Sequence, residues 1–255
     1  MSFDFNMADP TTAVSDPRGM CDESDFNGGA EVGSVPIGYA EIIVVRHGET
    51  EWNVDGRIQG HLDVELNEVG RKQAAAVADR LSKESAVSAV YSSDLKRALE
   101  TAQVMASSCG VPEIIQDPDL RERHLGNLQG LTSHEVANLK PNDYEACTSS
   151  RTDQEIPGGG ESFDQLYHRC TSSLERIAMK HIGKRVVVVT HGGVLRALHR
   201  RANPTLNLQE KILNASVSIF HISSEKWIVK TWNNIDHLNK TGFLETAFGG
   251  DSNSG

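Results

Sequence analysis

Two short runs of β-branched residues constrain the fold of this chain more than any other feature. Ile42-Ile43-Val44-Val45 and Val186-Val187-Val188-Val189 contain no polar residue, so a strand at either place must be covered on both faces. Between and after these runs, segments with helical spacing of apolar residues alternate with shorter strand-like segments. The alternation predicts a three-layer α/β/α sandwich with a mainly parallel central sheet.

The expected elements follow this alternation along the chain. We expect strands at 42–45, 87–91, 113–116, 185–190, 217–222 and 226–232. We expect helices at 67–83, 94–107 and 193–202, and two more that open with capping boxes at Thr132-x-x-Glu135 and Ser162-x-x-Gln165. No internal repeat is visible, and the pattern predicts one domain, residues 39–248.

The first 38 residues differ in composition from the rest. They hold seven acidic residues against one base, Arg18, and show no apolar periodicity. Such a segment buries too little apolar surface to offset the entropy of ordering, so residues 1–38 are expected to form a disordered acidic extension. A cleaved targeting peptide is the alternative, although transit peptides are rich in arginine and poor in acids. Residues 249–255 are expected to be disordered for the same reason.

Charge and cysteine spacing exclude several classes of protein. The formal net charge of −10 argues against a general nucleic-acid or membrane-surface binder, since both need a basic surface. No apolar run approaches the roughly 20 residues that span a bilayer. The four cysteines show no paired spacing, which argues against a disulfide framework or a structural zinc site. A reducing compartment fits this cysteine usage, and we expect a cytoplasmic protein.

Two predicted strands each end in a histidine followed by glycine. His47-Gly48 follows the first strand, and His191-Gly192 follows the strand at 185–190. A single histidine after a strand is more often structural than catalytic. Two at the carboxyl ends of strands in one sheet reach the same rim, where open α/β sheets bind ligands. The glycines would leave the backbone there free of side chains, so that a ligand could approach closely.

Two arginines are expected at the same rim. Arg46 precedes the first histidine, and Arg97 lies in the first turn of a predicted helix, where the helix dipole and backbone N–H groups favour an anion. This set suits a phosphoryl group, because guanidinium groups match its oxygens bidentately. Metal ligation by the histidines is the alternative, but the arginines would repel a divalent cation and no third ligand has suitable spacing. We expect no metal and no cofactor, with the arginines neutralising charge as Mg²⁺ does elsewhere.

The motifs around these residues resemble those of a known family. The similar segments occur in family order at 46–53, 56–60, 66–70, 92–102, 120–126, 157–162 and 190–196. Over residues 41–238 the chain resembles the histidine phosphatase superfamily, the phosphoglycerate mutase-like family. The resemblance implies the phosphoglycerate mutase-like form of the α/β/α sandwich.

The resemblance also implies roles for individual residues. His47 would be the nucleophile that takes the phosphoryl group on Nε2. Glu122 would protonate the leaving alkoxide and then deprotonate the attacking water. In so charged a segment, a solvated loop acid is the alternative for Glu122. The residues implied to hold the phosphate or stabilise the transition state are Arg46, Asn53, Gln59, Arg97, His191 and Gly192.

Two residues beside Glu122 bear on the rest of the substrate. Arg123 and His124 could contact a carboxylate near the phosphoryl group, which would indicate phosphoserine or a phosphoglycerate. They could equally be solvated, and the sequence leaves both alternatives open.

The departures from the mutase pattern favour hydrolysis. Leu125 stands where the mutases usually have tyrosine, and Gly193 stands where the mutase pattern has asparagine. The 69 residues from Glu122 to His191 are too few for the long insertion by which glycolytic mutases exclude water. We therefore expect a phosphatase acting on a small phosphorylated metabolite, and a homo-oligomer is compatible with the sequence. The alternatives are a cofactor-dependent phosphoglycerate mutase, a phosphoprotein phosphatase and an inert relative that only binds.

Overall fold

The computed structural model describes residues 35–84, 86–206 and 210–239. The expected N-terminal extension meets this range at residues 35–38, where Tyr39 donates its N–H to Pro36 O across a turn. Its remainder, and the expected tail at 249–255, lie outside the described residues. Within the described ranges, no helix is both long enough and apolar enough to cross a bilayer.

Within these residues, six strands form one sheet in the order β3-β2-β4-β1-β5-β6. The strands are β1 (Ala40–Arg46), β2 (Ala89–Ser92), β3 (Ile114–Gln116), β4 (Arg185–Thr190), β5 (Val217–Ile222) and β6 (Trp227–Asn234). β1 to β4 pair in parallel, whereas β5 runs antiparallel to β1 and β6 antiparallel to β5. The prediction of a mainly parallel sheet is confirmed.

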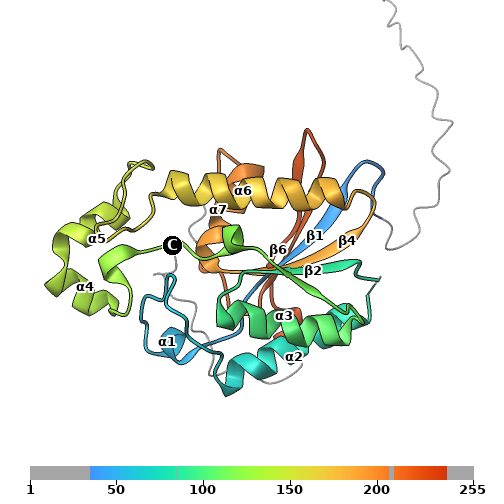
Figure 1. Cartoon of the computed structure of the whole chain (residues 1–255), viewed down its shortest axis with the longest axis horizontal. Helices are drawn as coiled ribbons and strands as arrows, with labels where there is room; N and C mark the ends of the chain where they lie inside the picture. The colour runs from blue at the N-terminus through green and yellow to red at the C-terminus, as the bar shows by residue number, and fades with distance from the viewer. Residues whose placement is uncertain (1–34, 85, 207–209, 240–255) are drawn as a thin grey trace, which may run out of the picture. The chain divides into compact units, whose positions relative to one another are not determined.

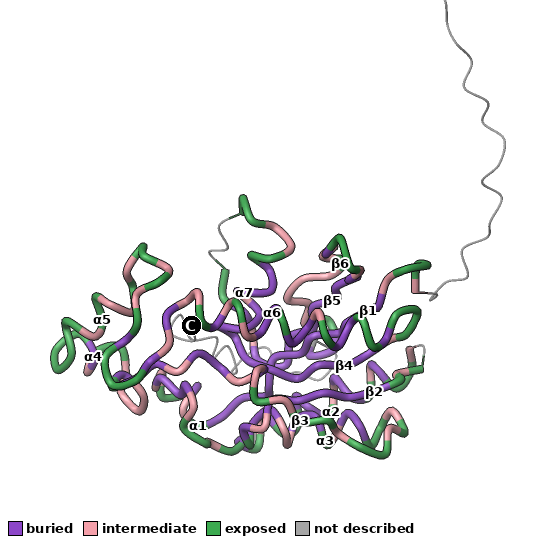
Figure 2. Tube along the Cα trace, turned by 45° about the horizontal axis from the view of Figure 1, so that its top comes forward, coloured by how far each residue is buried: buried purple, intermediate pink, exposed green. Residues whose placement is uncertain are grey.

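Helices cover both faces of the sheet. α2 (Glu68–Ser82) and α3 (Lys96–Ser108) lie on one face, and α6 (Phe163–Lys180) and α7 (Gly192–Ala202) lie on the other (Figure 1). The pleat of β1 explains this: Ile42 and Val44 join the core under α6 and α7, and Ile43 and Val45 join the core over α2 and α3. Burial on both faces accounts for the unbroken apolar runs (Figure 2).

Shorter elements complete the described chain. They are α1 (Glu51–Val54), the 3₁₀ helices η1 (Pro118–Leu120) and η2 (Gly126–Leu128), α4 (Ser133–Leu139), α5 (Pro141–Thr148) and α8 (Asp236–Asn239). Residues of η2 and α4 pack in a third, smaller core with Ile58, Leu125 and Ile156. The predicted capping boxes of Thr132 and Ser162 both form, and they begin α4 and α6.

The start of α3 differs from the prediction. The helix begins at Lys96 instead of 94, and Leu95 at its N-cap makes no side-chain hydrogen bond. Asp63, from a distant loop, accepts the Lys96 N–H at 2.7 Å instead. A cap supplied across the fold leaves no local sequence signal, which explains the two-residue error.

Candidate active site

The two predicted histidines lie together at the carboxyl edge of the sheet. β1 and β4 pair with Arg46 opposite Thr190, so the chain leaves both strands at the same level. His47 donates its backbone N–H to Thr190 O at 3.0 Å, and the ring centroids of His47 and His191 are 5.1 Å apart. Both side chains are buried. The structure thus brings the two histidines to one rim, as the sequence predicts.

His47 is held as a neutral imidazole. Its Nδ1 lies 2.7 Å from the carbonyl oxygen of Gly48, so this nitrogen carries the proton and donates it. Burial lowers the pKa of His47 well below its ordinary value, and the charges of Arg97 and then Arg46 lower it further. The unprotonated nitrogen is therefore Nε2, which keeps its lone pair for nucleophilic attack.

His191 is the N-cap residue of α7 and is neutral for similar reasons. Burial lowers its pKa well below the ordinary value, and the charge of Arg97 adds to this effect. Its Nε2 lies 2.9 Å from the hydroxyl of Ser93, which follows β2. Its Nδ1 is buried and has no hydrogen-bond partner within the described residues. If Ser93 donates to Nε2, then Nδ1 carries a proton that a bound ligand could accept.

The two arginines are buried and fixed by backbone carbonyls. Arg46 is 1% exposed and donates from Nη1 to Ile212 O. Arg97, also 1% exposed, donates from Nη1 to Leu62 O at 3.0 Å and from Nη2 to Gly60 O at 2.8 Å. Both positive charges are therefore set in place before any anion binds, which is the arrangement that stabilises developing negative charge.

Glu122 is buried instead of being a solvated loop acid. Its carboxylate accepts the Gly193 N–H, at 3.1 Å to each oxygen, and Oε1 accepts the Arg123 N–H at 2.8 Å. Gly193 lies in the first turn of α7, so the carboxyl group of Glu122 lies at the amino end of that helix. The carboxylate and His191 are thereby anchored to the same helix start.

Asn53 is buried in the first turn after β1, where it takes part in the capping box of α1. Its Oδ1 accepts hydrogen bonds from the Thr50 N–H at 3.1 Å and from Nδ2 of Asn214 at 3.2 Å. Because the oxygen faces these donors, the amide nitrogen of Asn53 faces the other way. Asn214 also donates to the carbonyl oxygen of His47 at 3.2 Å, which connects Asn53 to the nucleophile.

The family follows from a match over most of the described chain. A family model described as the histidine phosphatase superfamily (branch 1) matches residues 42–235. The chain belongs to this superfamily. The resemblance and the α/β/α fold predicted from the motifs are both confirmed.

Named relatives of this histidine phosphatase cover nearly the same range. "Phosphoglycerate mutase-like protein 4" from Arabidopsis thaliana is 58% identical over 223 residues, 87% of this chain and 97% of the relative. "Metal-independent phosphoserine phosphatase" from Arabidopsis thaliana is 55% identical over 212 residues, 83% of this chain and 89% of the relative. The solved structure of Bacillus stearothermophilus YhfR has a TM-score of 0.71 at 32% identity, over 78% of this chain and 99% of that chain.

The acceptor-side residues are partly engaged within the protein. Arg123 is buried rather than solvated, and its Nε donates to Glu161 O at 3.0 Å. His124 is half-buried, and its Nδ1 accepts the Gly126 N–H at 3.2 Å, so its proton is on Nε2. Its ring lies edge-on to His61, with centroids 4.8 Å apart. A contact of Arg123 or His124 with the substrate stays a prediction.

Gln59 and Gly192 are buried near this set. Gln59 is 7% exposed, and its Oε1 has no hydrogen-bond partner among the described residues. The next residue, Gly60, supplies one of the carbonyls that hold Arg97. Gly192 is the first residue of α7, directly after His191. Both positions agree with a phosphate-binding role, which stays a prediction.

Gly48 packs closely against the first turn of α2. A Cβ at this position would lie 2.5 Å from the carbonyl oxygen of Gly70 in the first turn of α2, and a Cβ on Gly70 would clash with the Glu49 carbonyl. The two glycines thus let the start of α2 approach the end of β1. Packing alone therefore requires glycine at position 48, and the expectation that it also makes room for a ligand stays a prediction.

One of the backbone amides that were expected to favour an anion at the start of α3 is engaged within the protein. Because Asp63 accepts the Lys96 N–H, that first-turn amide already has an acidic partner. What the start of α3 contributes to the rim is the guanidinium of Arg97, held by Gly60 and Leu62.

Three residues of the site were missed by the sequence analysis: Ser93, Asn214 and Arg169. Ser93 stands directly after β2, so the rule that located the histidines could have found it. Asn214 precedes β5, which is antiparallel to β1, so the beginning of β5 lies at the edge where the parallel strands end. Arg169 lies inside α6, seven residues past its N-cap, where no local signal marks it.

Potential metal ligands do not gather in the described part of the chain. No group of three or more His, Cys, Asp or Glu side chains there could hold a metal ion. Chelation of divalent cations tests the prediction of a metal-independent site.

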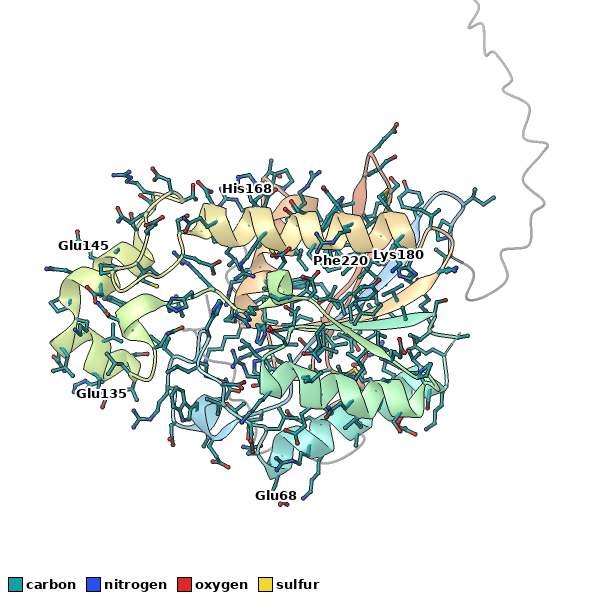
Figure 3. The ribbon with its side chains drawn as sticks, viewed as in Figure 1. Glu68, Glu135, Glu145, His168, Lys180 and Phe220 are labelled. Atoms are coloured by element: carbon teal, nitrogen blue, oxygen red, sulfur yellow. The ribbon has the colours of Figure 1, made fainter. Side chains whose placement is uncertain are left out.

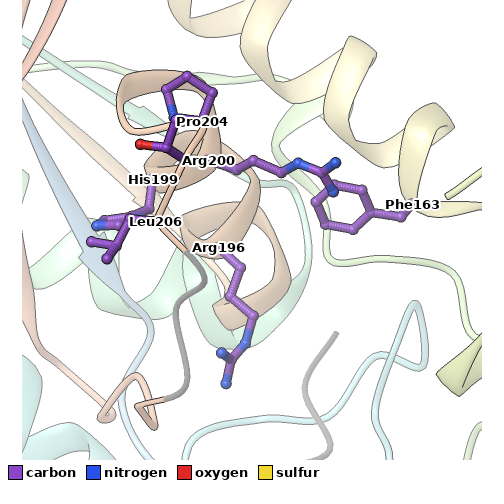
Figure 4. Close-up of a pocket in the computed structure, with 7 residues that line it drawn as sticks. Phe163, Arg196, His199, Arg200, Pro204 and Leu206 are labelled. Carbon is purple, nitrogen blue, oxygen red and sulfur yellow. The ribbon is translucent and has the colours of Figure 1, made fainter. Parts of the chain in front are cut away.

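A separate hollow of about 390 Å³ opens beside α7 (Figure 4). The Arg200 guanidinium lies over the Phe163 ring at 5.0 Å, and Arg196 donates to Glu210 O at 3.3 Å. The lining residues are Phe163, Arg196, His199, Arg200, Pro204, Thr205 and Leu206. The lining includes neither histidine of the pair nor Glu122, so this hollow is distinct from the site described above.

Proposed function

We propose that this histidine phosphatase hydrolyses small phosphomonoesters through a phosphohistidine on His47. One observation carries the proposal: a neutral imidazole, with Nδ1 bound to Gly48 O, lies beside the charges of Arg46 and Arg97. A neutral nucleophile beside fixed cations suits a dianionic phosphoryl group, because the cations bind the dianion and also keep the imidazole unprotonated.

In the first step, Nε2 of His47 attacks phosphorus while the ester P–O bond breaks. Arg46 and Arg97 neutralise charge on the phosphoryl oxygens, and the Nδ1–H of His191 donates to one of them. The protonated carboxyl of Glu122 gives its proton to the leaving alkoxide. The products of this step are an alcohol, a phosphohistidine and a Glu122 carboxylate.

In the second step, a water molecule replaces the alcohol. The Glu122 carboxylate takes a proton from this water as its oxygen attacks phosphorus, and the P–N bond to His47 breaks. Inorganic phosphate leaves, with His47 neutral and Glu122 protonated for the next cycle. Both steps use the position in which Gly193 and Arg123 hold the Glu122 carboxylate.

Phosphoserine is the first substrate to test. The relative at 55% identity is named a metal-independent phosphoserine phosphatase. The Nε2–H of His124, two residues from Glu122, is suited to a carboxylate on the leaving group. The proposed substrate is thus a small phosphorylated metabolite. Assembly into a homo-oligomer and a cytoplasmic location stay predictions.

A phosphoglycerate mutase is the second candidate, favoured by the name of the relative at 58% identity. A mutase must keep water from the phosphohistidine until a second hydroxyl takes the group back. Gly193 and the short span between Glu122 and His191 favour water as the acceptor.

The experiment measures both outcomes in one assay. We expect phosphate release from phosphoserine or 3-phosphoglycerate to exceed 3- to 2-phosphoglycerate interconversion at least roughly 100-fold, about 2.7 kcal/mol of barrier difference. Efficient interconversion stimulated by 2,3-bisphosphoglycerate, with slow phosphate release, would favour the mutase. A phosphopeptide panel tests the phosphoprotein alternative.

A further inference from the structure

Arg169 of α6 binds both the segment that carries Glu122 and the side chain of Glu161. Nε donates to Glu161 Oε1 at 2.6 Å, and Nη2 donates to Glu161 Oε2 at 2.8 Å and to Glu122 O at 2.7 Å. Nη1 donates to Asp119 O at 2.8 Å and to Arg121 O at 2.7 Å. A guanidinium has five N–H donors in a fixed fork, and here each has an acceptor.

Glu161 extends this contact to the other side of Glu122. Its Oε2 accepts the His124 N–H at 2.8 Å, and its own N–H donates to His124 O at 2.8 Å. Its carbonyl accepts Nε of Arg123 at 3.0 Å. The backbone before Glu122 is therefore fixed by Arg169, and the backbone after it by Glu161.

The Arg169–Glu161 ion pair is largely buried, with side chains 17% and 20% exposed. Burial is the largest influence and opposes both charges, but the hydrogen bonds and the charge attraction between the two side chains together outweigh it, so the pKa of Arg169 is raised and that of Glu161 is lowered. Both groups stay charged around neutral pH. Removing one partner would leave the other charge buried without compensation.

We propose that Arg169, held by Glu161, is a positioning residue for the acid–base function of Glu122. The inference rests on the proposed role of Glu122. Two amides hold the carboxylate end of Glu122, and Arg169 and His61 hold its carbonyl, at 2.7 and 2.6 Å. A displacement of about 1 Å in a reacting group can cost about 100-fold in rate, so a device that fixes both ends of one residue affects catalysis directly.

The test compares two leaving groups in Arg169→Lys. Lysine keeps the charge, but its three donors on one atom cannot reach three carbonyls and both Glu161 oxygens. We expect the rate of the first step for an alkyl phosphate, whose alkoxide needs a proton, to fall roughly 10- to 100-fold when it is measured as the pre-steady-state burst of alcohol release. The burst rate of nitrophenol release from p-nitrophenyl phosphate, whose anion leaves without a proton, should fall less than about 3-fold, because the base role of Glu122 in the second step does not enter this rate.

Two further variants serve as a control and as a second test of the inference. Arg176→Lys is the matched control, because Arg176 lies two turns along α6 and its exposed side chain contacts the Asp117 and Asp119 side chains instead of the backbone around Glu122. It should change both rates less than about 2-fold. Glu161→Gln keeps the shape of the side chain and removes its charge, so we expect the same selective loss for the alkyl phosphate. This variant tests the inference if Arg169→Lys does not fold.

Equal losses for the two substrates in Arg169→Lys or Glu161→Gln would overturn the inference, because they indicate general damage. The inference would also be overturned if Arg169→Lys lowered the rate as much in a Glu122→Gln background as in wild type. Glu122→Gln has no acid, so a residue that acts only by positioning that acid should have no further effect there. The assay follows release of the alcohol or nitrophenol. That release precedes both hydrolysis and transfer, so a mutase result would refute the proposed function and leave this comparison intact.

Discussion

Asn214 donates a hydrogen bond from Nδ2 to Oδ1 of Asn53 at 3.2 Å. The same nitrogen lies 3.2 Å from the carbonyl oxygen of His47, and both asparagines are buried. One amide group therefore joins the backbone of the predicted nucleophile to a predicted phosphate ligand. It also fixes which way the Asn53 amide faces.

Asn214→Ala should weaken catalysis to the same extent for substrates with good and with poor leaving groups. The variant leaves the His47 carbonyl and Asn53 Oδ1 each short of one donor, so we expect a loss of about 1–3 kcal/mol in the free energy of unfolding. Because the nucleophile and a phosphate ligand are both affected, kcat/KM should fall by a similar factor, on the order of 10-fold, for alkyl and p-nitrophenyl phosphates.

Urea unfolding and steady-state kinetics check this expectation, with Asn138→Ala on the exposed side of α4 as the control. A loss confined to alkyl phosphates would instead connect Asn214 with Glu122 and contradict the argument.

The position of Asn214 shows where sequence reasoning succeeded and where it failed. His47 and His191 could be predicted because each stands at the carboxyl end of an apolar run, so periodicity alone puts them at one edge. Asn214 precedes its strand, and it shares that edge because β5 is antiparallel to β1. Strand direction is a property of the whole sheet, and the sequence of β5 does not encode it.

The same distinction separates the helices that were predicted from those that were not. α6 has a local capping box at Ser162 and a buried stripe, so its sequence suffices to find it. α5 has no side-chain cap and no buried residue, so no periodic signal marks it. Arg169 was missed for a related reason: its acceptors are mostly backbone carbonyls, which carry no residue identity.

His47→Ala should abolish both turnover and phosphoenzyme formation, because the variant removes the Nε2 that forms the covalent bond. We expect kcat to fall by more than about 10⁴-fold. Acid-labile ³²P bound to protein after a brief reaction reports the phosphohistidine directly. If labelling persists in the variant, the nucleophile lies elsewhere, and His191, 5.1 Å away, would be the next residue to test.

Chelators should leave the rate unchanged, because Arg46 and Arg97 supply the positive charge that metal ions supply in other phosphoryl-transfer sites. The measurement is phosphate release before and after dialysis against EDTA, followed by addition of Mg²⁺, Mn²⁺ or Zn²⁺. Inactivation by EDTA that a divalent cation reverses would show that the enzyme depends on a metal.

His237 should make the fold less stable in mild acid. Its Nε2 donates a hydrogen bond to the carbonyl oxygen of Ala215, the residue after Asn214, at 2.9 Å. Its Nδ1 accepts a hydrogen bond from Nη1 of Arg80 at 3.3 Å. Burial lowers the pKa of His237 from 6.5 to about 4, and the Arg80 charge lowers it as well. A proton on Nδ1 would meet the N–H of Arg80, so the folded protein keeps this histidine neutral.

The sign of the pH effect follows from this lowered pKa. Between pH 6.5 and about 4 the unfolded chain binds a proton at His237 that the folded chain does not, so stability falls as the pH falls. Over that whole interval this group accounts for up to about 3 kcal/mol, and above pH 6.5 its contribution does not change with pH. His237→Gln can still donate to Ala215 O but cannot bind the proton.

Urea unfolding at pH 7.5 and pH 5 measures the difference. Between pH 7.5 and pH 5, the free energy of unfolding should fall by about 2 kcal/mol more for wild type than for His237→Gln. His168→Gln, on the exposed side of α6 (Figure 3), should behave as wild type does. Parallel losses in wild type and His237→Gln would mean that the buried imidazole already binds its proton in the folded state, and that the Arg80 contact rearranges to admit it.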